Sequence, residues 1–499
     1  MAYEKIFTLG KKKYSGEVNV ECSLGLESDE EILKVLSTNA RATISLPQTT
    51  GNEVVYNGNV NVCLIFAGKD AKIGSTQSVC PFIFKQQIDS AENKIVYGKA
   101  TISETKVESV TATGVKIVCT VLVETYVFSN GGIQVYVPED ESIISKLCEV
   151  STYKVGTQQT SNMVETVELT AKYPIKKVLC SQNNVVIKNS VADNNIATIS
   201  GEIQTNVVFI QDDETQKISN LSTTTPFRQE IEVASLKKED KIEAYAKVIA
   251  EKEVQTINGN KLNIEIPLEL FILPFESQEF TSVCDLFSLE NEIKTTTESF
   301  ENTTPLGSEY FEQKIEASLT LPENEPRVDK FLTSLGQKVK ITSAYVNDGS
   351  LILEGVAETN VVYVNDEMDS IHSVLVEIPF VTQARTEMDD NAMVLCEPTL
   401  TDFEVMVKRG RDVFVDAKIK ANCNFTKKED DSVISKVELG DELATHDEAI
   451  QIYFGKAGEA IWDIAKHLKI SPQIILEQNP SLSDPLEQDT KIVIYFQKK

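Results

Sequence analysis

The feature that most constrains this chain is a motif that occurs three times. Residues 58–66 read GNVNVCLIF, residues 201–209 read GEIQTNVVF and residues 355–363 read GVAETNVVY. Each copy begins with Gly and ends with an aromatic residue eight positions later, and a Pro-Phe pair follows 15 to 17 residues after that aromatic. The glycines at 58, 201 and 355 are 143 and 154 residues apart. This spacing is too long for a solenoid repeat and predicts three similar domains.

The residues within each repeat predict β-structure. Apolar, β-branched and aromatic residues alternate or run together in residues 114–128, 262–273 and 412–425, which occupy equivalent places in the three repeats. Turn sequences between such segments, for example Asn258-Gly259, are typical of hairpins. We therefore expect a mainly β fold in which three β-rich units form sandwich-like or barrel-like domains.

Breaks in this pattern predict short helices, linkers and domain limits. One short helix is expected early in each unit, over residues 29–37, 174–179 and 326–335. Linkers are expected at about 139–160 and 275–308, the second of which is polar and acidic. The predicted β-rich domains are therefore 1–150, 160–275 and 308–440. In each of them the aromatic that ends the motif (Phe66, Phe209 and Tyr363) is expected in the core, and the later prolines (Pro81, Pro226 and Pro379) are expected to end strands or start turns.

Residues 445–499 differ in kind and predict a small α+β domain. A short strand over 449–454 leads to a helix over 459–468, in which apolar residues recur at helical spacing. Ser471 is expected to cap a second helix that begins at Pro472, and a strand over 491–496 closes the domain. The expected order is strand, helix, helix, strand.

Charge and cysteine content exclude several classes of protein. The chain has 48 basic and 76 acidic residues, a net charge of −28, so repulsion from phosphates disfavours nucleic acid and anionic lipid as partners. Nine widely spaced cysteines without a CxxC pair predict neither a disulfide framework nor a zinc site, and Cys63 and Cys119 lie in apolar runs typical of core residues. Without a signal-peptide core or a run of 18 uncharged apolar residues, the expectation is a cytosolic protein with no transmembrane segment.

No pattern of catalytic chemistry is present in the sequence. The three histidines, His372, His446 and His467, have no ligand-spaced neighbours, and no Walker A, GxSxG or strand-to-helix GxGxxG pattern occurs. We therefore expect no catalytic residue, no metal and no cofactor. A hydrolase would need a clustered polar pocket that the sequence does not display.

The carboxy-terminal segment resembles a LysM domain. The family's tyrosine, glycine and tryptophan correspond to Tyr453, Gly458 and Trp462, its Asp-Ile-Ala to residues 463–465, and its Asn-Pro to Asn479 and Pro480. LysM domains usually bind N-acetylglucosamine polymers such as peptidoglycan, and this resemblance implies a glycan site at Gly458, Glu459, Asn479 and Pro480.

Two departures from the LysM pattern argue against glycan binding. Glu459-Ala460 stands where the family has Asp-Thr, which removes a hydroxyl donor, and residues 488–490 replace its Pro-Gly-Gln. Sugar sites depend on placed donors and on close approach of the backbone.

The three repeats resemble the SPOCS domain of spore-coat proteins, through the Gly-to-aromatic strand and the later Pro-Phe pair. Repeated SPOCS-like units followed by one LysM-like domain are similar to the SipL-type family of spore-coat morphogenetic proteins. This resemblance implies a non-enzymatic scaffold in the mother-cell cytoplasm that is recruited to the forespore surface. It also implies that the LysM-like domain binds the coat ATPase SpoIVA, and that other coat proteins or further copies of the chain bind elsewhere.

Four residues are the candidates for contact with a protein partner. Trp462, the single tryptophan, is either part of the small core or a partly exposed binding residue. Ile461 and Trp462 point about 100° apart on a helix, so one of them faces outward. Ile450 and Ile452 share one face of the opening strand and Tyr453 lies on the other, so the predicted docking surface joins Ile450, Tyr453, Ile461 and Trp462. The alternative is a peptidoglycan-binding protein of the spore cortex or cell wall.

Overall fold

The computed structural model describes residues 2–26, 31–69, 72–90, 93–214, 216–249, 255–257, 259–366, 370–443 and 449–496. These residues form a mainly β fold with two short helices, both in the carboxy-terminal segment. Every strand pairing is antiparallel. The fold class predicted from the alternating apolar pattern is confirmed at this level.

The first unit, β1 to β7, is made of two sheets that enclose one apolar core. One sheet has the order β1-β7-β6, and in the other β4 pairs with β2, β3 and β5. The strands are β1 (Ala2–Gly25), β2 (Lys34–Ile44), β3 (Gln48–Thr50), β4 (Glu53–Ala67), β5 (Ile73–Gln87), β6 (Lys94–Thr111) and β7 (Gly114–Val137).

The second unit, β8 to β15, also has two sheets around one core. One sheet has the order β10-β11-β12, and in the other the long strand β15 pairs with β8, β9, β13 and β14. The strands are β8 (Ile143–Val155), β9 (Gln159–Thr170), β10 (Ile175–Asp193), β11 (Ile196–Gln211), β12 (Ile218–Glu232), β13 (Lys241–Val248), β14 (Gln255–Ile257) and β15 (Lys261–Ser288).

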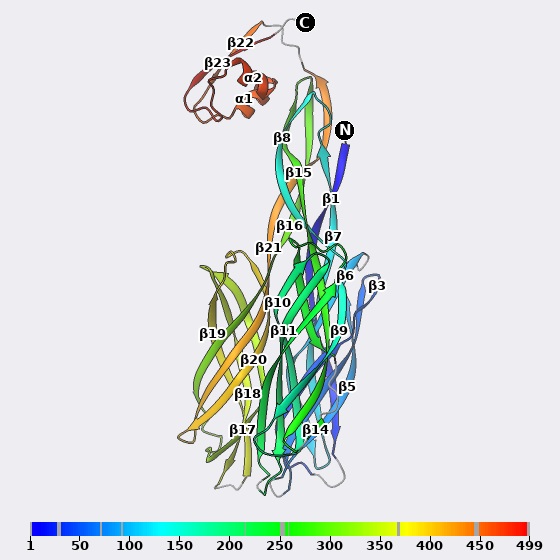
Figure 1. Cartoon of the computed structure of the whole chain (residues 1–499), viewed down its shortest axis with the longest axis vertical. Coiled ribbons are helices and arrows are strands. Elements are labelled where there is room, and N and C mark those ends of the chain that lie inside the picture. Colours follow the sequence, from blue (N-terminus) through cyan, green and yellow to red (C-terminus); the bar gives the residue numbers. More distant parts are fainter. Residues whose placement is uncertain are drawn as a thin grey trace.

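The third unit, β16 to β21, is one sheet of order β16-β21-β20-β17-β18-β19 that curls around its own core. The strands are β16 (Asn291–Thr320), β17 (Lys330–Asn347), β18 (Ser350–Asn365), β19 (Ser370–Arg385), β20 (Met393–Lys408) and β21 (Asp412–Glu442). In Figure 1 the strands of all three units run lengthwise in one bundle, and β8, β15, β16 and β21 extend beyond it toward the small carboxy-terminal module.

The repeated motif has the same geometry in each unit. Its glycine lies directly opposite the phenylalanine of the later Pro-Phe pair, in the pairs Gly58 with Phe82, Gly201 with Phe227 and Gly355 with Phe380. A Cβ atom on any of the three glycines would lie 2.4–2.7 Å from the opposing ring and 2.3–2.7 Å from a backbone oxygen of the strand on the other side. The glycine is therefore required by a phenylalanine ring that covers the backbone, which is a common way to stabilise glycine within a sheet.

The aromatic residues that end the motif, Phe66, Phe209 and Tyr363, are buried, which confirms their predicted place in the core. The prediction for the prolines was wrong, because all three lie inside strands. Each of those strands, β5, β12 and β19, pairs with a neighbour on one side only among the described residues. An edge strand tolerates proline because its N–H need not join a ladder.

The three predicted early helices are also wrong. Residues 34–37 belong to β2, residues 175–179 to β10 and residues 330–335 to β17, while residues 27–30 lie outside the described part of the chain. Each segment pairs, with register shifts, with the strand that carries the repeated motif, β4, β11 or β18. A helical period over ten residues or fewer was overridden by pairing with a neighbouring strand.

The segments expected to be linkers are largely strand. β8 begins at Ile143 and pairs along β15 from Ile143↔Ser288 to Val155↔Phe275, and β16 covers 291–320 in a pairing with β21. These long strands carry polar residues on their exposed faces, and this polar composition made the segments resemble linkers. The core of each unit is formed by residues from one continuous part of the chain. The exact domain limits remain a prediction.

Two disulfides correct the expectation of none. Cys148 bonds to Cys284 and Cys396 to Cys423, with sequence separations of 136 and 27 residues. The pairs meet because β8 lies beside β15 and β20 beside β21, which spacing along the chain does not reveal. Cys22, Cys63, Cys80, Cys119 and Cys180 are buried and form no disulfide, which confirms Cys63 and Cys119 as core residues.

Candidate docking site in the carboxy-terminal module

The carboxy-terminal module has the predicted element order. It consists of β22 (Ile450–Gly455), α1 (Ile461–Leu468), α2 (Pro472–Gln478) and β23 (Thr490–Tyr495), with β22 antiparallel to β23. Helix α1 buries residues spaced three and four apart, and Lys469 ends it in the left-handed conformation. Pro472 stands at the start of α2 as predicted, although the Ser471 side chain makes no cap hydrogen bond.

The outer face of the two-stranded sheet is apolar and exposed. Ile450 is 52% exposed, Ile452 48% and Phe454 74%, and Tyr495, which lies opposite Ile450, is 56% exposed. We call Ile450, Ile452, Phe454 and Tyr495 the β22 face. Ile450 is exposed on this face, and its role in docking stays a prediction. Phe454 was missed, although alternation along residues 450–454 puts it on the same face as the two isoleucines.

Tyr453, on the other side of β22, is engaged within the module. Its hydroxyl donates a hydrogen bond of 2.6 Å to Glu459 Oε1, and the backbone N–H of Lys456 donates to Glu459 Oε2 at 3.0 Å. These two bonds hold the pKa of Glu459 below its ordinary value. Both oxygens of the residue that replaces the LysM family's aspartate are thus committed to the protein itself.

The other candidate glycan residues serve the module's own backbone. Asn479 donates to the carbonyl oxygens of Ile475 and Val493 and accepts from the N–H of Val493. Gly458 has φ +87°, a conformation that favours glycine, and its N–H donates to Leu486 O. Pro480 is exposed. Of these four residues, Asn479 and Glu459 have their side chains engaged and Gly458 has its N–H engaged, so the structure gives no support for a glycan site here.

Ile461 and Trp462 face different ways, as their adjacency on a helix predicted. Ile461 is 1% exposed and packs in the module's core with Ile464 and Ile492, so it is not accessible to a partner. Trp462 is partly buried, and its partners belong to the second unit. The sequence left open whether Trp462 belongs to the small core or is an exposed binding residue. In the structure it lies in a contact between the module and β15.

We call this the Asp285 contact. Trp462 Nε1 donates a 2.7 Å hydrogen bond to Asp285 Oδ2, and Lys466 Nζ lies 2.5 Å from Asp285 Oδ1. The indole meets the Phe287 ring edge-on, with centroids 5.3 Å apart, and Lys469 Nζ lies 6.0 Å from the centroid of the same ring. Asp285 follows a register irregularity in the pairing of β15 with β8. A bulge of this kind redirects a side chain out of the ladder.

The electrostatics of the Asp285 contact favour the ionised carboxylate. Burial alone would raise the pKa of Asp285, but the hydrogen bonds from Lys466 and Trp462 outweigh burial and leave the pKa below its ordinary value. The contact is therefore strongest at a pH where Asp285 is charged.

Buried ion pairs join the three units to one another. Lys11 pairs with Glu243 at 2.6 Å between the first and second units, Lys99 with Glu397 at 2.8 Å between the first and third, and Lys420 with Glu202 at 2.9 Å between the third and second. All six side chains are no more than 27% exposed. Removing one partner of such a pair leaves a charge that is poorly solvated.

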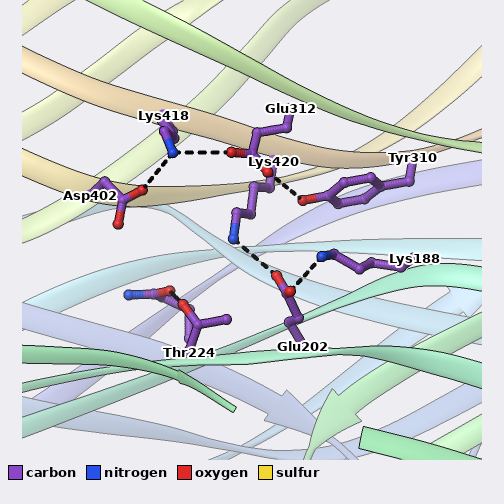
Figure 2. A network of polar contacts seen from close by, with 9 residues as sticks. Lys188, Glu202, Thr224, Tyr310, Glu312, Asp402, Lys418 and Lys420 are labelled. Carbon is purple, nitrogen blue, oxygen red and sulfur yellow. Dashed lines mark hydrogen bonds and ion pairs between the residues drawn. The ribbon is translucent and has the colours of Figure 1, made fainter. Parts of the chain in front are cut away.

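The third of these pairs belongs to a wider network, shown in Figure 2. Lys188 and Lys420 both reach the carboxylate of Glu202, and nearby Lys418 bridges Glu312 and Asp402. Burial would raise the pKa of Glu202, but the two lysines outweigh it and lower the pKa. Every charge in the network has an opposite neighbour, as expected of a structural interface.

Long antiparallel units joined by buried ion pairs, with a small module docked at one end, define a modular β-rich protein. Within this class, residues 174–256 and 330–408 match the family model described as SipL, SPOCS domain. These two regions therefore resemble repeated SPOCS domains of the SipL family, a match that suggests a link to sporulation. None of the curated proteins and none of the solved structures compared with the chain matched it.

The matched regions contain the second and third copies of the repeated motif. The first copy, at residues 58–82, lies outside them, although its Gly58–Phe82 pairing is the same as the other two. Neither helix of the described residues is long and apolar enough to cross a membrane.

Proposed function

We propose that the protein is a non-enzymatic scaffold in spore coat assembly, and that its carboxy-terminal LysM-like module binds the coat ATPase SpoIVA. The SPOCS match supports the sporulation setting. The observation that carries the docking proposal is the β22 face, where four large apolar side chains are exposed on a module of about 50 residues. Exposed apolar and aromatic groups gathered on one surface are typical of protein interfaces.

Strand β22 adds a second means of recognition. It pairs only with β23 among the described residues, so its other edge presents backbone N–H and carbonyl groups. A partner strand can add to such an edge while its side chains contact the neighbouring apolar face. Ile450 stays in the proposed surface. Tyr453 is left out because it lies on the other side of β22 and its hydroxyl is bound to Glu459. Ile461 is left out because it is buried, and Trp462 contributes only where the partner also reaches the Asp285 contact.

The proposed place of action is the mother-cell cytoplasm, with recruitment to the forespore surface by the module. The three β units provide length and further surface for other coat proteins or for additional copies of the chain. Residues 58–82 are proposed to belong to a third, more divergent SPOCS domain, because the Gly58–Phe82 pair repeats the geometry of the matched regions.

The test is a pull-down of SpoIVA and, in parallel, of peptidoglycan fragments with the full-length chain. Ile452→Arg and Phe454→Ser should each reduce SpoIVA retention at least tenfold, because each removes an exposed apolar contact without entering the core. The matched control is Ile474→Arg, an exposed isoleucine on α2 of the same module. Circular dichroism verifies that each variant folds. Undiminished retention by both β22 variants would overturn the proposed surface, and retention of glycan without SpoIVA would make the protein a cortex-binding or wall-binding protein instead.

A further inference from the structure

A large cavity lies where the three units meet. Its volume is about 630 Å³, and all three units contribute to its lining. The first unit contributes β2, β4, β5 and β6, the second β10 and β13, and the third β17 and β20. A volume of this size is typical of sites for small organic molecules.

The charge of the lining is opposite to that of the chain. Across the whole sequence acidic residues outnumber basic ones by 76 to 48. The charged residues that line the cavity are four cations and one carboxylate, namely Arg41, Lys99, Lys247, Lys338 and Glu397. An excess of positive charge inside an acidic protein concentrates field lines within the cavity and favours anions there.

The lysines of the lining differ in whether a carboxylate already pairs with them. Lys99 pairs with Glu397 at 2.8 Å, and Lys247 pairs with Glu269 at 2.5 Å. Lys338 makes no hydrogen bond or ion pair with any described residue. Its neighbour across the strand pair, Glu358, does not come within ion-pair distance.

The environment of Lys338 is unfavourable for an ammonium group that lacks a counter-ion. Burial lowers the pKa of Lys338, and the charge of Glu358 only partly opposes that shift. A positive group that is removed from water gains most from an anion placed beside it. Lys338 thus points to a negatively charged occupant of the cavity.

Amide side chains supply further donors to the same space. Asn39 donates to Gln182 Oε1 at 3.2 Å, and Gln182 donates to Gln337 O at 3.4 Å, which links the three units across the cavity wall. Asn61 and Asn184 also line the cavity, and their side chains form no hydrogen bond with described residues. Amide N–H groups beside a lysine are suited to bind carboxylate or phosphate oxygens.

We propose that this central cavity binds a small, multiply charged oxyanion, a polycarboxylate or a phosphorylated metabolite, and that Lys338 contacts its anionic group directly. The ligand would bridge all three units, so its binding would favour the assembled bundle over separated units. The proposal is independent of the docking module, because none of the residues that line the cavity belongs to it.

The test uses the full-length chain and two probes, citrate and inorganic phosphate. Isothermal titration calorimetry should show saturable binding of at least one probe, and the same probe should raise the melting temperature above that in sodium chloride of equal ionic strength. Binding of citrate alone would indicate a polycarboxylate, and binding of phosphate a phosphorylated ligand.

Two variants of neighbouring lysines on β17 decide the role of Lys338. Lys338→Gln should weaken binding of the probe at least tenfold, because a charge-assisted hydrogen bond to the anion is lost. Lys340→Gln, which changes an exposed lysine on the same strand, should leave the affinity unchanged. The proposal is overturned if neither probe binds beyond the effect of ionic strength, or if both variants bind it as the unaltered chain does.

Discussion

Replacing Asp285 with alanine should weaken the contact between the carboxy-terminal module and β15. The substitution removes both oxygens that accept from Trp462 and Lys466, and it leaves the apolar contact with Phe287 in place. Hydrogen bonds to a charged group contribute about 1.5–3 kcal/mol each. The Lys466 side chain is 42% exposed and that of Asp285 35%, so solvent screening reduces the ion pair to about 0.5 kcal/mol.

Together these contributions give about 2 kcal/mol for the Asp285 contact, which corresponds to about a 30-fold change in the ratio of docked to released module. Trp462 is the single tryptophan of the chain, so its fluorescence reports on this contact without interference. In Asp285→Ala the emission should shift to longer wavelength, and acrylamide should quench it more strongly, because the indole gains contact with water.

The matched control is Glu279→Ala, which removes an exposed carboxylate from the same strand. Circular dichroism and thermal melting establish that both variants keep the β fold. If emission and quenching in a folded Asp285→Ala protein equal those of the unaltered chain, the carboxylate does not hold the indole and the reasoning is refuted. An equal change in Glu279→Ala would refute it as well.

Three further predictions concern pH, the repeated motif and the interfaces. The pKa of Asp285 is lowered in the folded protein, so this carboxylate stabilises the contact at neutral pH and stops doing so as the pH falls below about 4. Acrylamide quenching of Trp462 should therefore increase below about pH 4 in the unaltered chain and should not increase there in Asp285→Ala. Gly355→Ala should lower the free energy of unfolding in urea by about 2–4 kcal/mol, because the new Cβ would lie 2.3 Å from Lys340 O. The control Gly25→Ala, whose new Cβ would have no atom within 4 Å, should change this free energy by less than about 0.5 kcal/mol. Lys420→Ala should cost about 2–3 kcal/mol in the same assay because it leaves Glu202 with Lys188 alone, and an unchanged midpoint would show that the pair does not join the units.

The sequence predicted what depends on short-range pattern. Alternation along residues 114–128 indicated strands, and the threefold Gly-to-aromatic motif located three strands whose glycines all face a phenylalanine. The order strand, helix, helix, strand followed from a helical period beside Pro472. In each case the residues that decide the local conformation are close together in the chain.

What could not be predicted depends on partners far apart in the sequence. Trp462 and Asp285 are separated by 177 residues, and nothing near either one indicates the other. The segments 34–37 and 330–335 look helical alone and become strands because β4 and β18 pair with them. Cys148 meets Cys284 through the pairing of β8 with β15, which is set by the whole length of both strands.

The ring of buried Lys–Glu pairs also determines how the molecule can be dissected. Each unit supplies one side of two pairs, and Leu36, Leu179 and Leu335, one from each unit, meet in a single apolar cluster. A fragment cut at the ends of one unit would expose one side of two pairs and its own part of that cluster to water. The three units should therefore be produced together, and a single unit cut out of the chain should fold poorly.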